Sequence, residues 1–299
     1  MQKFLGYTCL LFAPSVLVSG ACADGGTSDI ASAGAPVLAR GGAPVTASGG
    51  AGASSGSAGA LASSGANASG AAAKGGAGSG MGGGAGAEPF NTNSPFAKLL
   101  SRRLFEEMFP DRGTFYTYAS LIEAADSFPD FASDGSDAAK REAAAFLANV
   151  ERETLGLVYA DEIIRGVYCA PSPECPCAEG KSYWGRGALQ LSWNYNYCAA
   201  GQALGLPLQS SPELVSAEPK LAWRTALWFW MTQTSATSHT PHQAIQDTGF
   251  GETIRIINGG IECNGPTDPG VQAAVQQRKT HYLLYTSKLG VAPGGPVDC

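Results

Sequence analysis

The sequence predicts a mainly α-helical domain over residues 90–299, preceded by a long segment that cannot build a core. Residues 24–89 contain few large apolar side chains, whereas nearly all the aromatic residues follow Phe90. After that position apolar side chains recur mainly at helical spacing, and residues 219–232 are apolar on nearly every side. The fold class therefore depends on the C-terminal part of the chain alone.

The first 23 residues have the layout of a secretory signal peptide, with Lys3 ahead of an apolar run over residues 9–18 and small residues after it. Such a run is too short to span a membrane. The stretch ending at Cys22 loosely resembles a bacterial lipobox, which makes Cys22 a candidate for lipidation, while ordinary cleavage after Ala23 fits as well. We expect an exported protein without a transmembrane span, either released or anchored.

Residues 24–89 are rich in Gly, Ala and Ser, a composition that should behave as a flexible, disordered linker. It is either a spacer that lifts a domain from a surface or a neutral insertion. The formal net charge of -6 argues against a nucleic-acid partner, which requires a clustered basic face. A neutral polymer is a better partner.

Six cysteines remain after the signal and Cys22 are set aside, and in an exported chain an even number predicts three disulfides. The sequence alone leaves fifteen pairings open. Cys175 and Cys177 are a weak zinc motif, because no second pair stands at ligand spacing. The six are Cys169, Cys175, Cys177, Cys198, Cys263 and Cys299.

Residues from Asp137 onward predict a helix whose apolar stripe includes Ala143, Phe146, Val150 and Leu157, with a stop at Gly156. Glu153 falls on that stripe, where a hydrophobic residue would be expected. It is either a functional carboxylate or an edge residue that reaches water or pairs with a nearby arginine, Arg152 or Arg141.

Apolar and polar residues alternate from Leu189 to Tyr197, which predicts an extended segment. One face would carry Gln190, Ser192, Asn194 and Asn196, and the other Leu189, Leu191, Trp193, Tyr195 and Tyr197. Uncharged amides and a hydroxyl suit sugar hydroxyls, although an ordinary half-buried strand is the alternative. Glu153 and Glu162 lie shortly before this segment, and two carboxylates beside a polar, aromatic surface suggest glycoside cleavage.

Three further features complete the prediction. Residues 219–232 form a helix buried at the centre, whose tryptophans are mainly core, and residues 270–289 form a closing helix. Asn258, Gly259 and Gly260 form a tight turn. His239 and His242 are structural, since no third metal-ligand cluster stands nearby.

Several motifs in order resemble glycoside hydrolase family 19 chitinases, from about Phe115 to Cys299, and the short spacing after Glu153 is similar to the compact bacterial members. The motifs are 146–149, 153–154, 183–197, 225–231, 250–254 and 257–263. The resemblance implies a mainly α, two-lobed, lysozyme-like fold with a cleft for a chain of N-acetylglucosamine units.

The resemblance also implies roles for individual residues. Glu153 would be the general acid, Glu162 the general base that stays ionised in a polar turn, and Ser192 would help to orient water or substrate. Substrate contacts would come from Gln190, Tyr195, Asn196 and Asn258. Disulfides would join Cys169 to Cys177 and Cys263 to Cys299, which leaves Cys175 for Cys198.

Two positions depart from the family pattern. Arg152 stands where the family has His, and the arginine of the last helix aligns with Ala274, so Glu262 would lose an expected partner. Arg278, one turn further along the same helix face, or Arg152 would have to supply the charge.

We therefore expect a monomeric, inverting endochitinase acting on chitin or chitin oligomers, without metal or cofactor, outside the cell or anchored to the bacterial cell surface. Peptidoglycan cleavage by the same fold is one alternative. A chitin-binding protein with weakened catalysis, prompted by Arg152 and Ala274, is the other.

Overall fold

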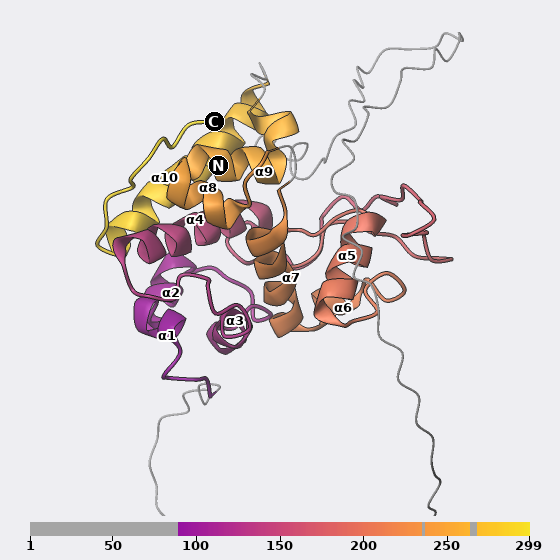
Figure 1. Cartoon of the computed structure of the whole chain (residues 1–299), viewed down its shortest axis with the longest axis horizontal. Coiled ribbons are helices and arrows are strands. Elements are labelled where there is room, and N and C mark those ends of the chain that lie inside the picture. The colour runs from indigo at the N-terminus through magenta and orange to yellow at the C-terminus, as the bar shows by residue number, and fades with distance from the viewer. Residues whose placement is uncertain (1–88, 235–236, 264–267) are drawn as a thin grey trace, which may run out of the picture. The chain divides into compact units, whose positions relative to one another are not determined.

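The computed structural model describes residues 89–234, 237–263 and 268–299, and these residues form a helical domain (Figure 1). The expected signal peptide, Cys22 and the linker up to residue 88 lie outside this part of the chain. The helices are α1 Pro95–Leu99, α2 Arg102–Met108, α3 Tyr118–Ala125, α4 Asp137–Thr154, α5 Asn194–Leu204, α6 Leu214–Ala217, α7 Pro219–Thr232, α8 Pro241–Asp247, α9 Phe250–Glu262 and α10 Pro269–Lys288. Within the described ranges no helix is both long and apolar enough to cross a membrane.

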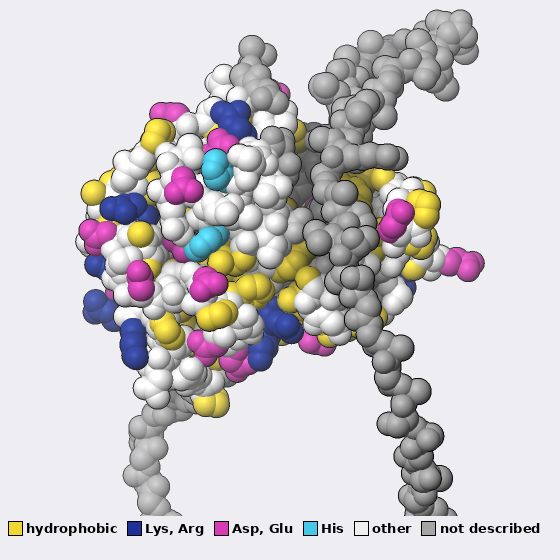
Figure 2. Space-filling model, in the orientation of Figure 1, with side chains coloured by type: hydrophobic (Ala, Val, Ile, Leu, Met, Phe, Trp, Pro, Cys, Tyr) yellow, Lys and Arg dark blue, Asp and Glu magenta, His cyan; other side chains and the backbone are white. Residues whose placement is uncertain are grey.

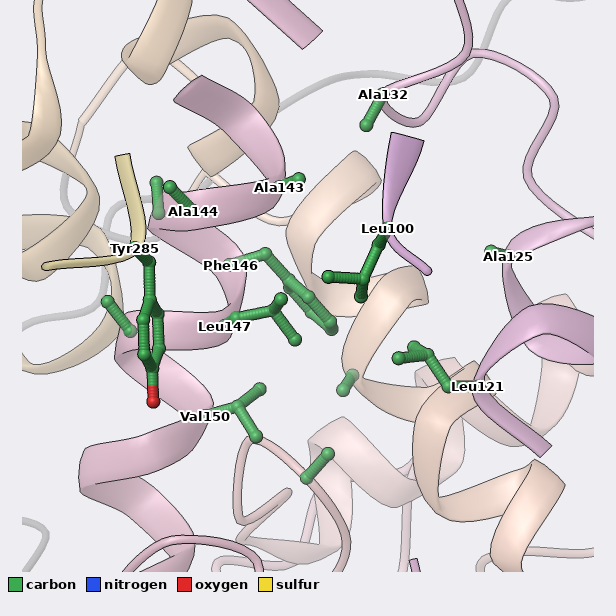
Figure 3. Packing of buried hydrophobic residues seen from close by; sticks show 14 of the residues in the cluster. Leu100, Leu121, Ala125, Ala132, Ala143, Ala144, Phe146, Leu147, Val150 and Tyr285 are labelled. Carbon is green, nitrogen blue, oxygen red and sulfur yellow. The ribbon is translucent and has the colours of Figure 1, made fainter. Parts of the chain in front are cut away.

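Helix α4 contributes many of the side chains of the larger core. The Ser136 hydroxyl caps its first turn by accepting the Ala139 N–H at 3.1 Å. Figure 3 shows Phe146, Leu147 and Val150 entering the same packed interior as Leu100 and Leu121. Helix α10 packs along α4.

The end of α4 differs from the sequence prediction by a few residues. The helix ends at Thr154, and both Leu155 and Gly156 adopt left-handed backbone angles, with φ of 51° and 74°. Leu157 is buried as expected, but it lies beyond the helix, where its N–H donates to the Thr154 hydroxyl at 2.8 Å. Glu153 is thus placed in the last turn of the helix, directly before a sharp change of chain direction.

The domain has two hydrophobic cores, which correspond to two lobes. Helix α7 confirms the predicted central helix, because Trp223 and Trp230 are fully buried in the larger core while Trp228 joins the smaller one. Figure 1 shows α5 and α6 on one side of α7 and the other helices on the opposite side. The smaller core consists of Tyr183, Leu191, Tyr197, Ala200, Leu208, Val215, Leu221 and Trp228.

The predicted extended segment over residues 189–197 is wrong. Only isolated antiparallel bridges form here, between Arg186 and Leu191 and between Asp161 and Arg186, and α5 begins at Asn194. Positive φ values of 48° at Gln190 and 74° at Trp193 turn the chain and break the two-residue period. As a result Asn194 is buried and Tyr195 is exposed, the reverse of the predicted faces.

The visible surface of the larger lobe carries acidic and basic side chains interspersed, without a broad basic patch on this face (Figure 2). This distribution agrees with the net charge of -6.

Candidate active site

Glu153 lies in the last turn of α4 with its side chain 13% exposed, and Arg278 of α10 contacts it. The Arg278 Nη2 donates to Glu153 Oε1. The carboxylate on the apolar stripe is therefore neither a simple core residue nor a solvated edge residue. It sits at the margin of the interior, next to a buried cation.

Arg278 joins Glu153 to Glu262 of α9. Its side chain is only 1% exposed, and its Nε and Nη2 donate to the two Glu262 carboxylate oxygens at 2.8 and 2.9 Å. Burial lowers the pKa of Arg278, but the negative charges of Glu153 and Glu262 outweigh it, so the net shift is upward. This guanidinium is charged at any working pH.

The expected loss of a partner for Glu262 is therefore wrong. Ala274 and Arg278 stand one turn apart on α10, and the long Arg278 side chain supplies the bidentate pair that Ala274 cannot. Burial raises the pKa of Glu262, yet the charge and hydrogen bonds of Arg278, with help from Asn258 and Arg152, hold it below its usual value. Arg152 contributes its charge nearby, and among the described residues no group accepts a hydrogen bond from its buried Nε.

Asn258 and Asn149 fix the same network from opposite sides. Asn258 donates its Nδ2 to Glu262 Oε1 at 2.9 Å, and Asn149 Oδ1 accepts from Arg278 Nη1 at 3.0 Å. The predicted tight turn at Asn258 is wrong, since the residue lies inside α9 at a kink with φ -147° and ψ 27°. The kink, rather than a turn, directs this amide toward Glu262.

Glu162 is buried, with 2% of its surface exposed, rather than solvated in a polar turn. Its Oε1 accepts from the Tyr168 hydroxyl at 2.7 Å and its Oε2 from the Gly185 N–H at 2.9 Å. Burial raises the pKa of Glu162, the two hydrogen bonds oppose that rise, and the net direction is upward. The carboxylate thus lies in a buried setting that raises its pKa, and its role as an ionised base stays a prediction.

The two glutamates are electrostatic neighbours, because the negative charge of Glu153 contributes to the raised pKa of Glu162. A cavity of about 370 Å³ lies along residues 158–163 and Arg165, with Glu162 in its wall. The structure thus brings a cation-bound carboxyl and a carboxyl held by neutral donors into one region.

Two of the expected site residues, Gln190 and Ser192, lie beside Gly185. A methyl group built on Gly185 would stand 2.9 Å from Gln190 Oε1 and 3.3 Å from Ser192 Oγ, so both side chains approach the residue whose N–H holds Glu162. Gln190 Nε2 donates to Gly187 O at 2.9 Å. Its buried Oε1 accepts no hydrogen bond from the described residues. The Ser192 hydroxyl donates to Gln190 O at 2.8 Å.

Tyr195 and Asn196 stand in the first turn of α5, just beyond that group. Tyr195 is 39% exposed and therefore available to a ligand, whereas Asn196 Nδ2 donates to Ser192 O at 2.9 Å. Sequence reasoning missed Tyr168, Gly185 and Asn149. Asn149 and Gly185 lie inside the motifs 146–149 and 183–197, but no pattern assigns them a role, since Asn149 acts through a contact 129 residues away and Gly185 through its backbone N–H. Tyr168 lies outside those motifs.

Three disulfides brace the domain. They join Cys169 to Cys177, Cys175 to Cys198 and Cys263 to Cys299, with Cα–Cα distances of 6.1, 5.8 and 5.3 Å. The first closes a short loop after Glu162, the second holds that loop against α5, and the third ties the residue after α9 to the C-terminus. His242 contacts the buried Glu142 at 2.5 Å, in the larger core rather than beside Glu153.

Comparisons with known proteins extend over this domain. Residues 91–299 match the family described as chitinase class I. An endochitinase of Arabidopsis thaliana is 46% identical over 190 residues, which are 64% of this chain and 62% of that protein. The chain thus spans less than two thirds of that relative's length.

Solved structures match the domain nearly from end to end. Chitinase C from Streptomyces griseus HUT6037 is 46% identical with a TM-score of 0.64, covering 69% of this chain and 99% of that one. A family GH19, class IV chitinase from Zea mays is 37% identical with a TM-score of 0.61, covering 69% and 100%. The predicted mainly α, two-lobed, lysozyme-like fold is confirmed by these neighbours.

Proposed function

The chain belongs to the class I chitinases of glycoside hydrolase family 19, and from that premise we propose that it is an inverting endochitinase that hydrolyses β-1,4 bonds between N-acetylglucosamine units. The observation that carries the proposal is the pair Glu153 and Glu162, which lie within electrostatic reach of each other in two different settings. Hydrolysis of a glycosidic bond needs one group that gives a proton and one that takes it.

We assign Glu153 as the general acid. Arg278 occupies Glu153 Oε1, so Oε2 is the oxygen that would pass a proton to the leaving glycosidic oxygen. Glu262 accepts two bonds from the same arginine and neutralises most of its charge. Arg278 therefore fixes the position of the Glu153 carboxyl.

We assign Glu162 as the general base. In an inverting reaction the base holds a water molecule against the opposite face of the sugar, about 6.5–9.5 Å from the acid. The raised pKa of Glu162 makes it a stronger proton acceptor once it is ionised, and Tyr168 and Gly185 fix the direction of its oxygens. Ser192, Gln190, Tyr195, Asn196 and Asn258 are then the groups proposed to hold water and substrate.

The Arg278 network removes one of the two reasons for proposing a chitin-binding protein with weakened catalysis. That hypothesis depended on Glu262 having lost its partner, and Glu262 instead receives a bidentate pair. An active enzyme is the better-supported function.

An anomeric assay on a soluble N-acetylglucosamine oligomer tests the proposal, because it reports activity and stereochemistry together. The wild type should release the α-anomer, Glu153→Gln should abolish hydrolysis while oligomer binding persists, and Glu162→Gln should lower the rate severely. Glu179→Gln, an exposed glutamate of the same lobe, is the control and should behave as wild type. Near-normal turnover by Glu153→Gln, or a β-anomer as first product, would refute the assignment.

We also propose that residues 1–23 export the chain, that residues 24–89 form a spacer, and that the catalytic domain of residues 90–299 acts as a monomer outside the cell. The three disulfides support an oxidising compartment. Labelled fatty acid supplied to cells that express the wild type or Cys22→Ala tests the anchor. Label in the wild type alone supports it, and no label in either removes it.

A further inference from the structure

A bulge projects from the wall of the cavity beside Glu162. Three backbone bonds pair residues 160–167 with 183–187 in antiparallel fashion, and between the last two of them residues 163–166 stand opposite Trp184 alone. The surplus residues must therefore loop outward, from a base held at both ends. The three bonds run from Gly187 N to Ala160 O (2.8 Å), from Glu162 N to Gly185 O (2.8 Å) and from Tyr183 N to Val167 O (2.9 Å).

The bulge and its flanks carry an unusual concentration of exposed apolar side chains, here called the apolar rim: Val158, Tyr159, Ile163, Ile164 and Val167. Their exposed fractions lie between 41% for Tyr159 and 63% for Val167. Over the described residues, the other exposed large hydrophobic side chains are Tyr195, Leu283 and Leu284, at 39%, 43% and 45%. A gathering of exposed apolar side chains in one stretch of chain favours an interaction site.

The rim is continuous with the proposed active site. Val158, Tyr159 and Ile163 line the same cavity of about 370 Å³ as Glu162. Ile164 and Val167 extend the apolar surface beyond that cavity, with 58% and 63% of their surface exposed. A ligand that leaves the cavity along the bulge would therefore meet these side chains next.

The charged side chain of the bulge, residues 163–166, is paired. Arg165 is the charged residue of the bulge, and it pairs with Asp161 at 3.7 Å while its guanidinium lies 5.0 Å from the centre of the Trp184 ring. An acidic protein or an anionic lipid surface would require unpaired cations here. An uncharged polymer whose sugar rings present C–H faces requires apolar contact instead.

We propose that the apolar rim docks the enzyme on the uncharged surface of insoluble chitin, next to the chain that enters the cavity. This inference rests on the proposed function, since it names the solid form of that substrate as the occupant. Ile164 and Val167 supply contact with the solid. Their position beside the Glu162 cavity places that cavity at the polymer surface.

The test compares adsorption with soluble turnover in the full chain. Ile164→Ser/Val167→Ser removes rim surface from positions outside the cavity, and Leu283→Ser/Leu284→Ser removes a matched exposed pair, 43% and 45% exposed, from α10. Adsorption isotherms on washed crystalline chitin should show about tenfold weaker binding for the rim variant, or about 1.4 kcal/mol. Its kcat/KM on a soluble oligomer and its melting temperature should match wild type, and the α10 variant should adsorb as wild type does.

Equal adsorption of the rim variant and the wild type would overturn the inference, and so would an equal loss in the α10 variant, which would indicate unspecific apolar adsorption. A wild-type dimer that light scattering finds converted to monomer in the rim variant would assign the rim to a second copy instead. A wild type that hydrolyses no oligomer refutes the proposed function, a result separate from any adsorption difference.

Discussion

Arg278 should be the residue whose replacement destabilises the domain most through charge, because it is the buried cation between two carboxylates. The test is a double-mutant cycle of Arg278→Gln, Glu262→Gln and the two combined. The cycle isolates the Arg278–Glu262 pair, whose two hydrogen bonds measure 2.8 and 2.9 Å.

The expected magnitudes follow from burial. Arg278→Gln removes the contacting cation from Glu262, whose side chain is 3% exposed, and leaves only Asn258 and the nearby charge of Arg152, which costs about 3–5 kcal/mol of unfolding free energy. Glu262→Gln costs less, about 1–3 kcal/mol, since the amide oxygen still accepts a bond and Glu153 still faces Arg278. The double variant should cost less than the sum by about 1–3 kcal/mol, because neither charge is then left unpaired.

Urea unfolding at neutral pH measures all four proteins, and an unchanged slope with urea confirms that the variants unfold from the same native state. The pKa of Glu262 is lowered in the folded protein, so its stabilising contribution is present above the usual glutamate value of about 4.3 and is lost as the pH falls through its folded pKa. The difference between wild type and Arg278→Gln should therefore shrink on acidification. Additive costs within about 0.5 kcal/mol, or a cost for Arg278→Gln below about 1 kcal/mol, would refute the reasoning.

Three further predictions concern contacts that the sequence did not reveal. Tyr168→Phe removes a hydrogen bond that opposes the upward pKa shift of Glu162, so the acid limb of kcat should move to higher pH while KM is unchanged. The hydrogen bond to Glu142 raises the pKa of His242, so this pair stabilises the fold below about pH 6.5 and the contribution is lost as the pH rises through the folded pKa. His242→Gln should accordingly cost more unfolding free energy at pH 6 than at pH 9. Gly251→Ala should cost about 1–3 kcal/mol, because its methyl group would lie 2.0 Å from a carbonyl oxygen of the C-terminal tail.

Each of these has a direct control. Gly260→Ala, also in α9, has no neighbouring atom within 4 Å of the added methyl group and should be tolerated, so equal costs at the two glycines would contradict the steric argument. Tyr282→Phe removes a hydroxyl that donates to Pro293 O, far along the chain from Glu162, and should leave the acid limb in place. A pH-independent cost of His242→Gln would show that packing alone, without the ion pair, fixes α8.

The long helices were predictable from the sequence because burial determines which positions are apolar. Helix α4 shows this as an apolar stripe that includes Phe146 and Val150, and α7 as a run that is apolar on nearly every side, with Trp223 and Trp230 fully buried. The segment from Leu189 to Tyr197 has an equally regular pattern and is not a strand. Its alternation is broken by left-handed residues at Gln190 and Trp193, a conformation that non-glycine residues seldom adopt and that hydrophobicity cannot report.

The contacts of Arg278 could not be predicted from the sequence for a different reason. Ala274 and Arg278 project from the same face of α10, and the sequence does not say how far the arginine side chain reaches toward α4 and α9. Only the packing of the three helices places one guanidinium against Glu153, Glu262 and Asn149 at once. Position along a helix was predictable, but the crossing of three helices was not.

The two glutamates lie in different surroundings, and their proposed roles differ accordingly. Glu153 is held by a permanent cation whose charge is shared with Glu262, so Arg278 fixes its Oε1. Glu162 is held by a phenol and a backbone N–H, which direct its oxygens without a contacting charge, while burial raises its pKa. The division of labour therefore resides in Arg278 and Tyr168 as much as in the glutamates themselves.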